Sequence, residues 1–133
     1  MPTMKDSRNL SIRVLLIDDE HGYVYVLSKR LSKRGFEVGK ASSGSEAFQI
    51  LRQRNFDVAI LDLKMTDMDG IEVLKVLKKM APELVVIMLT GHGSAEAAHE
   101  GIRLGAYDYL TKPCETEELI EIIMEAYDKR SAL

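Results

Sequence analysis

Apolar runs and helical apolar stripes alternate five times along the chain, and this alternation predicts five strand–helix units. The strands are expected at Ile12 to Ile17, Phe36 to Lys40, Asp57 to Leu61, Leu84 to Leu89 and Ala106 to Leu110. The first, third and fourth of these strands are continuously apolar over Val14 to Ile17, Val58 to Leu61 and Leu84 to Leu89. We therefore expect helices to cover both faces of the central strands.

Capping signals mark where the intervening helices begin and end. The first helix is predicted from residue 20 to 34 and stops at Gly35. Ser43 and Asp69 open the next two helices, because a glutamate follows each of them at the spacing of a capping box. The fourth helix is expected from near Ser94 to Gly105. The core-facing residues expected on the third and last helices are Val73, Val76, Leu77, Met80, Leu119, Ile122, Ile123, Ala126 and Tyr127.

Five such units predict an α/β fold, a doubly wound five-stranded parallel sheet with five helices. Right-handed crossovers leave few strand orders, and the flavodoxin-like order 2-1-3-4-5 is one of them. In that order the chain reverses between strands one and three, and ligands bind there, outside the carboxyl ends of the strands. The domain is expected at residues 11–130, after a disordered lead-in at 1–10 and before a tail at 131–133.

Acidic residues stand at this switch point. Asp18 and Asp19 follow the first strand, and Asp62 follows the third. Thr90 and Lys112 follow the fourth and fifth strands, so all five side chains are expected at one edge of the sheet. Three neighbouring carboxylates repel one another, and a hard dication removes that conflict. Mg²⁺ is the expected ion, because it accepts a few carboxylates, retains waters and bridges to phosphate oxygens.

A carboxylate in this position can also act as a nucleophile. Asp62, at the start of a loop, has the access needed to form an acyl phosphate. Lys112 can place a charge on one phosphoryl oxygen, and Thr90 can donate its hydroxyl to another. The plainer alternatives are a solvated lysine, a hydroxyl that binds its own loop, and aspartates that only cap the first helix. The joint placement of these residues at strand ends favours the site.

Composition narrows the class of protein. The chain has 133 residues, enough for one domain with a real core, and a net charge of -3. That charge argues against direct binding of nucleic acid or an anionic membrane. The chain has neither an apolar run of membrane-spanning length nor a signal peptide, which predicts a cytoplasmic protein. Cys114 is the only cysteine, so an internal disulfide is excluded, and no motif supports a catalytic thiol.

Four segments together resemble the receiver domain of bacterial two-component response regulators. The resemblance covers about residues 12 to 129 and looks most like receivers of the nitrogen-regulation type, which precede enhancer-binding ATPase domains. The four segments are Asp18-Asp19, Asp62 to Gly70, Leu89 to Gly93 and Gly105 to Pro113.

The resemblance implies a phosphorelay role in signal transduction. Asp62 would accept a phosphoryl group from a sensor histidine kinase or a histidine phosphotransfer protein. Asp19 and Asp62 would bind Mg²⁺ directly, together with the backbone carbonyl of Lys64, whereas Asp18 would act mainly through water. The protein would not be an enzyme, because it would catalyse only its own phosphorylation and dephosphorylation.

The same resemblance implies a conformational switch. Thr90 and Lys112 would contact the phosphoryl group, and Lys112-Pro113 would be a cis peptide. Tyr109 would be the switch aromatic, turning inward as Thr90 moves towards the phosphate. The surface of the fourth helix, fifth strand and last helix would then meet a downstream output protein or domain. A phosphorylation-dependent dimer stays open, although the acid-rich last helix lacks the arginine that matches the dimer face of winged-helix regulators.

Several positions depart from the family or vary within it. Proline often stands at the position of Thr66, so the loop here is expected to be more mobile. Lys64 and His92 are hypothesised to flank the path of the hydrolytic water and to tune the phosphoryl lifetime. The alternative is that both face solvent with little effect. His21 and His99 are taken as surface residues away from the phosphoryl site.

Other functions are less well supported. A phosphohydrolase of the haloacid dehalogenase type needs a second acid two residues after its nucleophile, where Lys64 stands. An interaction module without phosphorylation usually lacks part of the acidic set or the lysine, and a flavodoxin-like cofactor binder needs a phosphate loop after strand one. The sequence leaves open whether the chain is a single-domain regulator or the receiver part of a longer transcriptional regulator.

Overall fold

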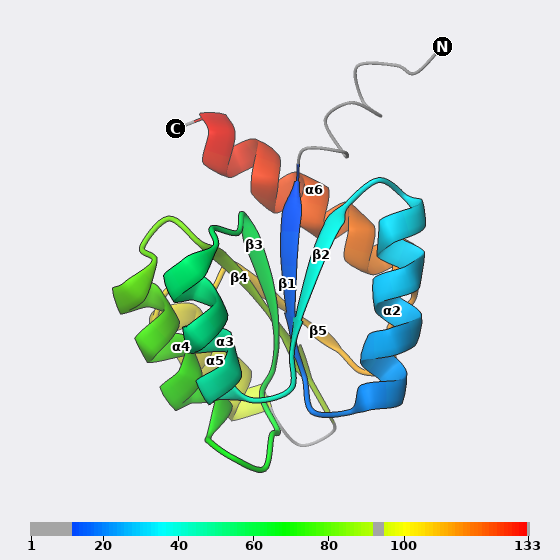
Figure 1. Cartoon of the computed structure of the whole chain (residues 1–133). Helices are drawn as coiled ribbons and strands as arrows, with labels where there is room; N and C mark the ends of the chain where they lie inside the picture. The colour runs from blue at the N-terminus through cyan, green and yellow to red at the C-terminus, as the bar shows by residue number, and fades with distance from the viewer. Residues whose placement is uncertain (1–11, 92–94, 133) are drawn as a thin grey trace.

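Five parallel strands form one sheet in the order β2-β1-β3-β4-β5 in the computed structural model of the chain, which describes residues 12–91 and 95–132 (Figure 1). The predicted doubly wound fold and strand order are confirmed. The strands are β1 (Arg13–Ile17), β2 (Glu37–Ala41), β3 (Val58–Asp62), β4 (Val85–Thr90) and β5 (Asp108–Thr111).

Helices cover both faces of this sheet, as the apolar central strands require. On one face α2 and α6 pack together, and on the other α3, α4 and α5 form a row (Figure 1). Among the described residues, no helix combines the length and apolar character that a membrane crossing requires. The helices are α2 (His21–Lys33), α3 (Gly44–Gln53), α4 (Gly70–Met80), α5 (Ala95–Arg103) and α6 (Thr116–Ala132), the last of which extends past residue 130.

Alternate side chains of the central strands supply two separate cores. Val14 and Leu16 of β1 point towards α2 and α6 and are fully or almost fully buried. Leu15 and Ile17 point to the opposite face, where they pack under α3 and α4. Both faces of β1 therefore exclude water, and the strand holds the residues that follow it in fixed positions.

The predicted strands begin one or two residues too early, and all but the first also end one residue too early. Asp62 and Thr90 are consequently the last residues of β3 and β4, not the first residues of loops. Asp62 is in register with Leu89, and Thr90 with Thr111. Because both residues belong to the sheet, their backbones are held by the ladder, and only their side chains project at its carboxyl edge.

The buried stripes of two helices differ from the prediction. In α4 the stripe runs through Val73, Leu74 and Leu77, whereas Val76 is half-buried and Met80 is 37% exposed. Met80 is the last residue of the helix, where the chain turns away from the sheet towards β4. In α6 the prediction missed Ile120, which is buried. It also overstated the burial of Ile122 and Tyr127, which are half-buried.

The predicted helix starts at Ser43 and Asp69 are confirmed. The Ser43 hydroxyl accepts a hydrogen bond from the Glu46 N–H at 3.0 Å, and the Asp69 carboxylate accepts one from the Ile71 N–H at 2.9 Å. The carboxylate of Glu46 accepts from the Ser42 N–H, one residue before the capping serine. These caps fix where the chain enters α3 and α4.

A buried ion cluster closes the edge of the sheet opposite the switch point. Asp57 is 4% exposed and accepts hydrogen bonds from the Arg13 N–H at 2.8 Å and from the Arg130 guanidinium at 3.0 Å. Burial raises the pKa of Asp57, but the hydrogen bonds from Arg13 and Arg130 outweigh it, and the net pKa lies below its usual value. The cluster links Arg13 at the start of β1, Asp57 just before β3 and Arg130 on α6.

Candidate functional site

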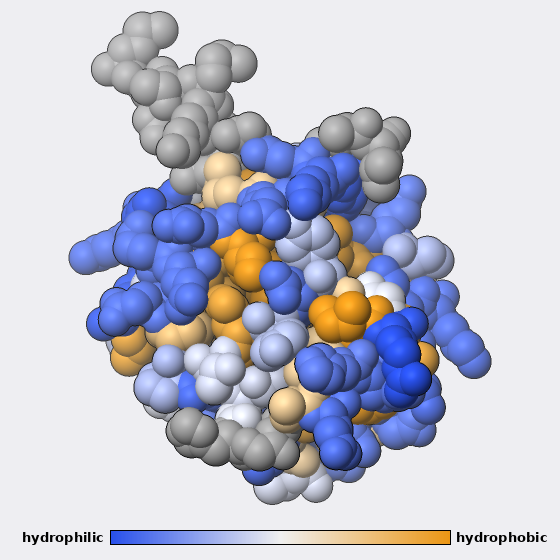
Figure 2. All heavy atoms as spheres, turned by 180° about the vertical axis from the view of Figure 1, so that it is seen from behind, coloured by the Kyte–Doolittle hydropathy of each residue, from blue (hydrophilic) through white to orange (hydrophobic). Residues whose placement is uncertain are grey.

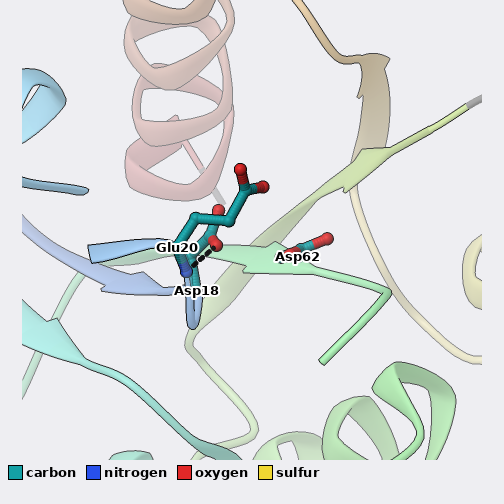
Figure 3. Close-up of side chains that lie close together, drawn as sticks. All are labelled: Asp18, Glu20 and Asp62. Atoms are coloured by element: carbon teal, nitrogen blue, oxygen red, sulfur yellow. Dashed lines mark hydrogen bonds between the residues drawn. The ribbon is translucent and has the colours of Figure 1, made fainter. Parts of the chain in front are cut away.

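Three carboxylates gather at the carboxyl ends of β1 and β3. Oxygens of Asp18, Glu20 and Asp62 all lie within 4.8 Å of one another. Figure 3 shows Asp18 and Glu20 following β1, with Asp62 beside them at the end of β3. Asp18 and Asp62 are 4% and 6% exposed, whereas Glu20 is exposed to solvent. Hard oxygen ligands from two buried residues and one exposed residue could hold a divalent cation.

Lys112 lies among these acids. Its ammonium is 2.8 Å from Asp18 Oδ2, 2.7 Å from Glu20 Oε1 and 3.6 Å from Asp62 Oδ2. It also lies 4.5 Å from the centre of the Tyr23 ring. Burial lowers the pKa of Lys112, but the hydrogen bonds to Asp18 and Glu20 outweigh burial and raise the pKa overall. A permanent positive charge therefore stands beside the Asp62 carboxylate.

Asp19 lies apart from this cluster. Its Oδ2 accepts hydrogen bonds from the N–H and the hydroxyl of Thr66, at 3.0 and 3.3 Å. Sequence reasoning placed Asp19 with Asp18 and Asp62 and overlooked Glu20, which it used only as the start of the first helix. The signal was present, because three acids follow β1 without interruption. Glu20 is the N-cap residue of α2, from which its longer side chain reaches Lys112.

The loop after Asp62 is anchored at several points. The Lys64 N–H donates to Asp62 Oδ1 at 3.0 Å, and Lys64 forms an antiparallel bridge with Asp69. The Asp67 carboxylate accepts from the Gly44 N–H at the start of α3. With the two bonds from Thr66, these contacts connect the loop to the end of β1 and to the start of α3, and its greater mobility stays a prediction. The Lys64 side chain is exposed, and His92 lies outside the described residues.

Thr90 and Tyr109 lie on the neighbouring strands β4 and β5. Thr90 is 3% exposed, and its hydroxyl donates to the Leu110 carbonyl at 3.4 Å. Tyr109 is half-buried, and its ring meets the His99 ring edge-on with centroids 6.4 Å apart. His99 is exposed, as predicted, yet it contacts the expected switch aromatic. The Lys112-Pro113 peptide is cis, as the resemblance implied.

This geometry agrees with what comparison with known proteins finds. The profile of the response regulator receiver domain matches residues 14–124. The chain belongs to the response regulator receiver family. The predicted resemblance is therefore confirmed, and the four strand-end residues Asp18, Asp62, Thr90 and Lys112 lie at one edge of a receiver sheet.

Individual relatives support the same assignment. Transcriptional regulatory protein GlrR of Escherichia coli (strain K12) is 35% identical over 116 residues, which are 87% of this chain and 26% of GlrR. The crystal structure of a response regulator receiver domain protein from Clostridium thermocellum has a TM-score of 0.86 at 34% identity, covering 91% of this chain and 98% of that one. NtrX from Brucella abortus has a TM-score of 0.85 at 32% identity, covering 90% of this chain and 27% of NtrX.

These matches confirm the likeness to receivers of the nitrogen-regulation type. They also limit which properties of these relatives apply to this chain. The chain spans about a quarter of the length of the curated relatives it matches, so their shared part with this chain is the receiver alone.

The electrostatics of the receiver site centre on Asp62. Burial raises the pKa of Asp62 to about 6, and the nearby Asp18 carboxylate also raises it, although the Lys64 N–H and the Lys112 ammonium lower it. Near neutral pH the ionised Asp62 is therefore less stable in the folded receiver than in the unfolded chain. A cation bound at the cluster would remove this penalty.

We expect the Asp62→Asn receiver to unfold at a higher temperature than the wild type at about pH 8 without Mg²⁺. The folded pKa of Asp62, about 6, lies above the unfolded value, so its stabilising contribution is complete below the unfolded pKa and is lost as pH rises through about 6. The difference in melting temperature should thus fade between about pH 6 and pH 4. Thermal unfolding across this range measures it. Equal melting temperatures at the higher pH would contradict the expectation.

Proposed function

We propose that this receiver accepts a phosphoryl group onto Asp62 in a Mg²⁺-dependent reaction. One observation carries the proposal: a buried carboxylate with a raised pKa lies 3.6 Å from the ammonium of Lys112, beside two more carboxylates, at the end of a sheet strand. Such a group is partly desolvated and has a cation beside it, as a nucleophile for phosphoryl transfer requires.

The residues present fit Mg²⁺. The cluster offers only oxygen ligands, which are the ligands that Mg²⁺ prefers. Oxygens of Asp18 and Asp62 lie within 4.8 Å of each other, and Asp19 directly follows Asp18 at the end of β1. We assign Asp62 and Asp19 as direct ligands with the Lys64 carbonyl, and Asp18 as a ligand through water. When bound, the ion neutralises the charge that builds up on the transferred oxygens.

In the proposed transfer an Asp62 oxygen attacks the phosphorus of a phosphohistidine on a sensor kinase or phosphotransfer protein. The phosphorus–nitrogen bond breaks, and its electron pair returns to the imidazole. Lys112 turns from the carboxylates to one phosphoryl oxygen. The Thr90 hydroxyl leaves the Leu110 carbonyl and donates to another phosphoryl oxygen.

The change of hydrogen-bond partner at Thr90 would carry a conformational change from the phosphoryl site to a distant surface. The Leu110 carbonyl that Thr90 would release lies in β5, next to Tyr109. We propose that Tyr109 then turns inward and leaves His99, which changes the face formed by α5, β5 and α6. Ile102 on α5 is 38% exposed, and Ile122 on α6 is half-buried. Figure 2, seen from behind Figure 1, shows apolar side chains exposed among hydrophilic ones on that side of the molecule.

The receiver would thus be a switch with no turnover of other substrates. The exposed Lys64 occupies the position where a dehalogenase-type phosphohydrolase needs its second acid. Lys64 and His92 are still expected to tune the phosphoryl lifetime. We further propose that the protein is cytoplasmic and that its receiver domain spans residues 11–130. The domain would act either alone in a phosphorelay or as part of a longer transcriptional regulator. It would bind neither nucleic acid nor membrane directly. Any phosphorylation-dependent dimer would form without the charged dimer face of winged-helix regulators.

Intact mass after incubation with Mg²⁺ and a small phosphoryl donor tests the proposed reaction. We expect one added phosphoryl group on the wild type, and none on Asp62→Asn or in the absence of Mg²⁺. Glu83→Gln is a matched control, because it removes an exposed carboxylate far from the cluster and should still be modified. A folded wild type that gains no mass would favour an interaction module without phosphorylation.

A further inference from the structure

Thr66 connects two loops that each supply an expected Mg²⁺ ligand. Its N–H and its hydroxyl both donate to Oδ2 of Asp19, at 3.0 and 3.3 Å, across 47 positions of sequence. Asp19 follows β1, while Thr66 lies two residues after Lys64 in the loop that follows β3. A proline, which often stands at this position in the family, has no N–H and no hydroxyl and could make neither bond.

We propose that Thr66 is a positioning residue. By holding Asp19 and the Lys64 segment in place before the ion binds, Thr66 raises the affinity of the site for Mg²⁺. This inference rests on the proposed Mg²⁺-dependent function. It goes beyond that function because it assigns part of the affinity to a side chain that does not touch the ion.

Two bonds to one oxygen leave the other oxygen of Asp19 available. Among the described residues, every hydrogen bond found to the Asp19 carboxylate goes to Oδ2. Mg²⁺ takes its carboxylate ligands through single oxygens, so Oδ1 can bind the ion while Oδ2 stays on Thr66. Hydrogen bonds to the outer oxygen of a ligating carboxylate fix its orientation, and their loss typically weakens metal binding by about 10-fold to 100-fold.

Contacts on both sides of Thr66 hold its loop in place. The bridge between Lys64 and Asp69 closes the loop, and the Asp67 carboxylate holds the start of α3 through the Gly44 N–H. Thr66 stands between these two anchors. Its donors therefore lie in a restrained segment, and Asp19 is fixed by contact with that segment although its own side chain is only half-buried. Without the two bonds, Asp19 would have to be ordered when the ion binds, at a cost in side-chain entropy.

Calorimetric titration of Mg²⁺ into three variants tests the proposal. Thr66→Pro removes both donors and is expected to weaken Mg²⁺ binding about 10-fold. Thr66→Val keeps the N–H and the side-chain shape, so its loss should be smaller. Thr66→Ser keeps both donors and is the matched control, with affinity close to that of the wild type. Melting curves without Mg²⁺ establish that each variant is folded.

A second readout separates positioning from a general structural effect. The Mg²⁺ concentration that gives half-maximal phosphorylation should rise by the same factor as the dissociation constant, while the rate at saturating Mg²⁺ stays unchanged. The inference would be overturned if Thr66→Pro and Thr66→Val are folded and bind Mg²⁺ as tightly as the wild type. If Thr66→Pro does not fold, the Mg²⁺ affinity of Thr66→Val alone decides the inference. A wild type that binds no Mg²⁺ would instead count against the proposed function itself.

Discussion

Replacement of Lys112 by methionine is expected to slow phosphoryl transfer to Asp62 by about 100-fold. The ammonium lies 3.6 Å from Asp62 Oδ2, where it can move onto an oxygen of the incoming phosphoryl group as negative charge develops. Methionine keeps an unbranched, flexible side chain over the Tyr23 ring but carries no charge. Loss of one fixed donor at a site of developing charge has an effect of this size in enzymes.

The same substitution is expected to tighten Mg²⁺ binding. In the wild type Lys112 contacts Asp18 and Glu20 at 2.8 and 2.7 Å and neutralises part of the acidic cluster. Without the ammonium, the carboxylates attract a dication more strongly. The transfer rate and the Mg²⁺ affinity should therefore change in opposite directions. Rates measured by intact mass at saturating Mg²⁺, with calorimetric Mg²⁺ affinities, give both quantities.

Lys112→Arg is the matched control, because it keeps the charge but places it in a planar fork. We expect it to restore part of the transfer rate and to leave Mg²⁺ affinity near that of the wild type. A Lys112→Met receiver that loses both transfer and Mg²⁺ binding would indicate a structural role for Lys112 and contradict this assignment.

Asp57→Ala is expected to lower the free energy of unfolding by about 2 to 3 kcal/mol near neutral pH. Asp57 is buried at the opposite edge of the sheet and accepts from the Arg13 N–H and from two guanidinium groups. Alanine would leave that N–H without its partner. The estimate is at the low end for a buried pair, because the side chains of Arg13 and Arg130 are 39% and 32% exposed and can be solvated.

The effect of Asp57 should depend on pH. The folded pKa of Asp57 is depressed, so its contribution is present above the unfolded pKa and is lost as pH falls through the folded value. The difference between wild type and Asp57→Ala should shrink as the solution is acidified below about pH 4. Urea unfolding at neutral and acidic pH measures this difference. Arg130→Met should cost less than Asp57→Ala at neutral pH, and an equal or larger loss would contradict the central role given to the carboxylate.

The sheet was predictable because its strands are covered on both sides. Continuous apolar runs such as Val58 to Leu61 have no other plausible place in a chain of this size, and handedness then limits the strand order. The same reasoning located Asp18, Asp62, Thr90 and Lys112 at one edge, since parallel strands end together. The placement of these residues depends on topology alone and needs no knowledge of side-chain contacts.

Side-chain orientation was harder to predict. The sequence places Asp19 and Glu20 next to each other, but it does not show that the Asp19 carboxylate bonds to Thr66, 47 residues away, while the longer Glu20 side chain reaches Lys112 beside Asp18 and Asp62. The rotation of α4 was also missed, because Leu74 and Val76 are both apolar and helical spacing allows either to face the core. Contacts between distant loops decide both outcomes, and periodicity carries no information about them.

Reductive trapping with borohydride tests the central claim most directly. Hydride reduces an acyl phosphate of aspartate to the alcohol, homoserine, but leaves free carboxylates unchanged, so peptide mass spectrometry can locate the modified residue. After incubation with Mg²⁺ and a small phosphoryl donor, we expect homoserine at position 62 and at no other acidic residue of the cluster. Homoserine in place of Asp18, Asp19 or Glu20, or none in a folded receiver, would contradict the assignment of Asp62 as the phosphoryl acceptor.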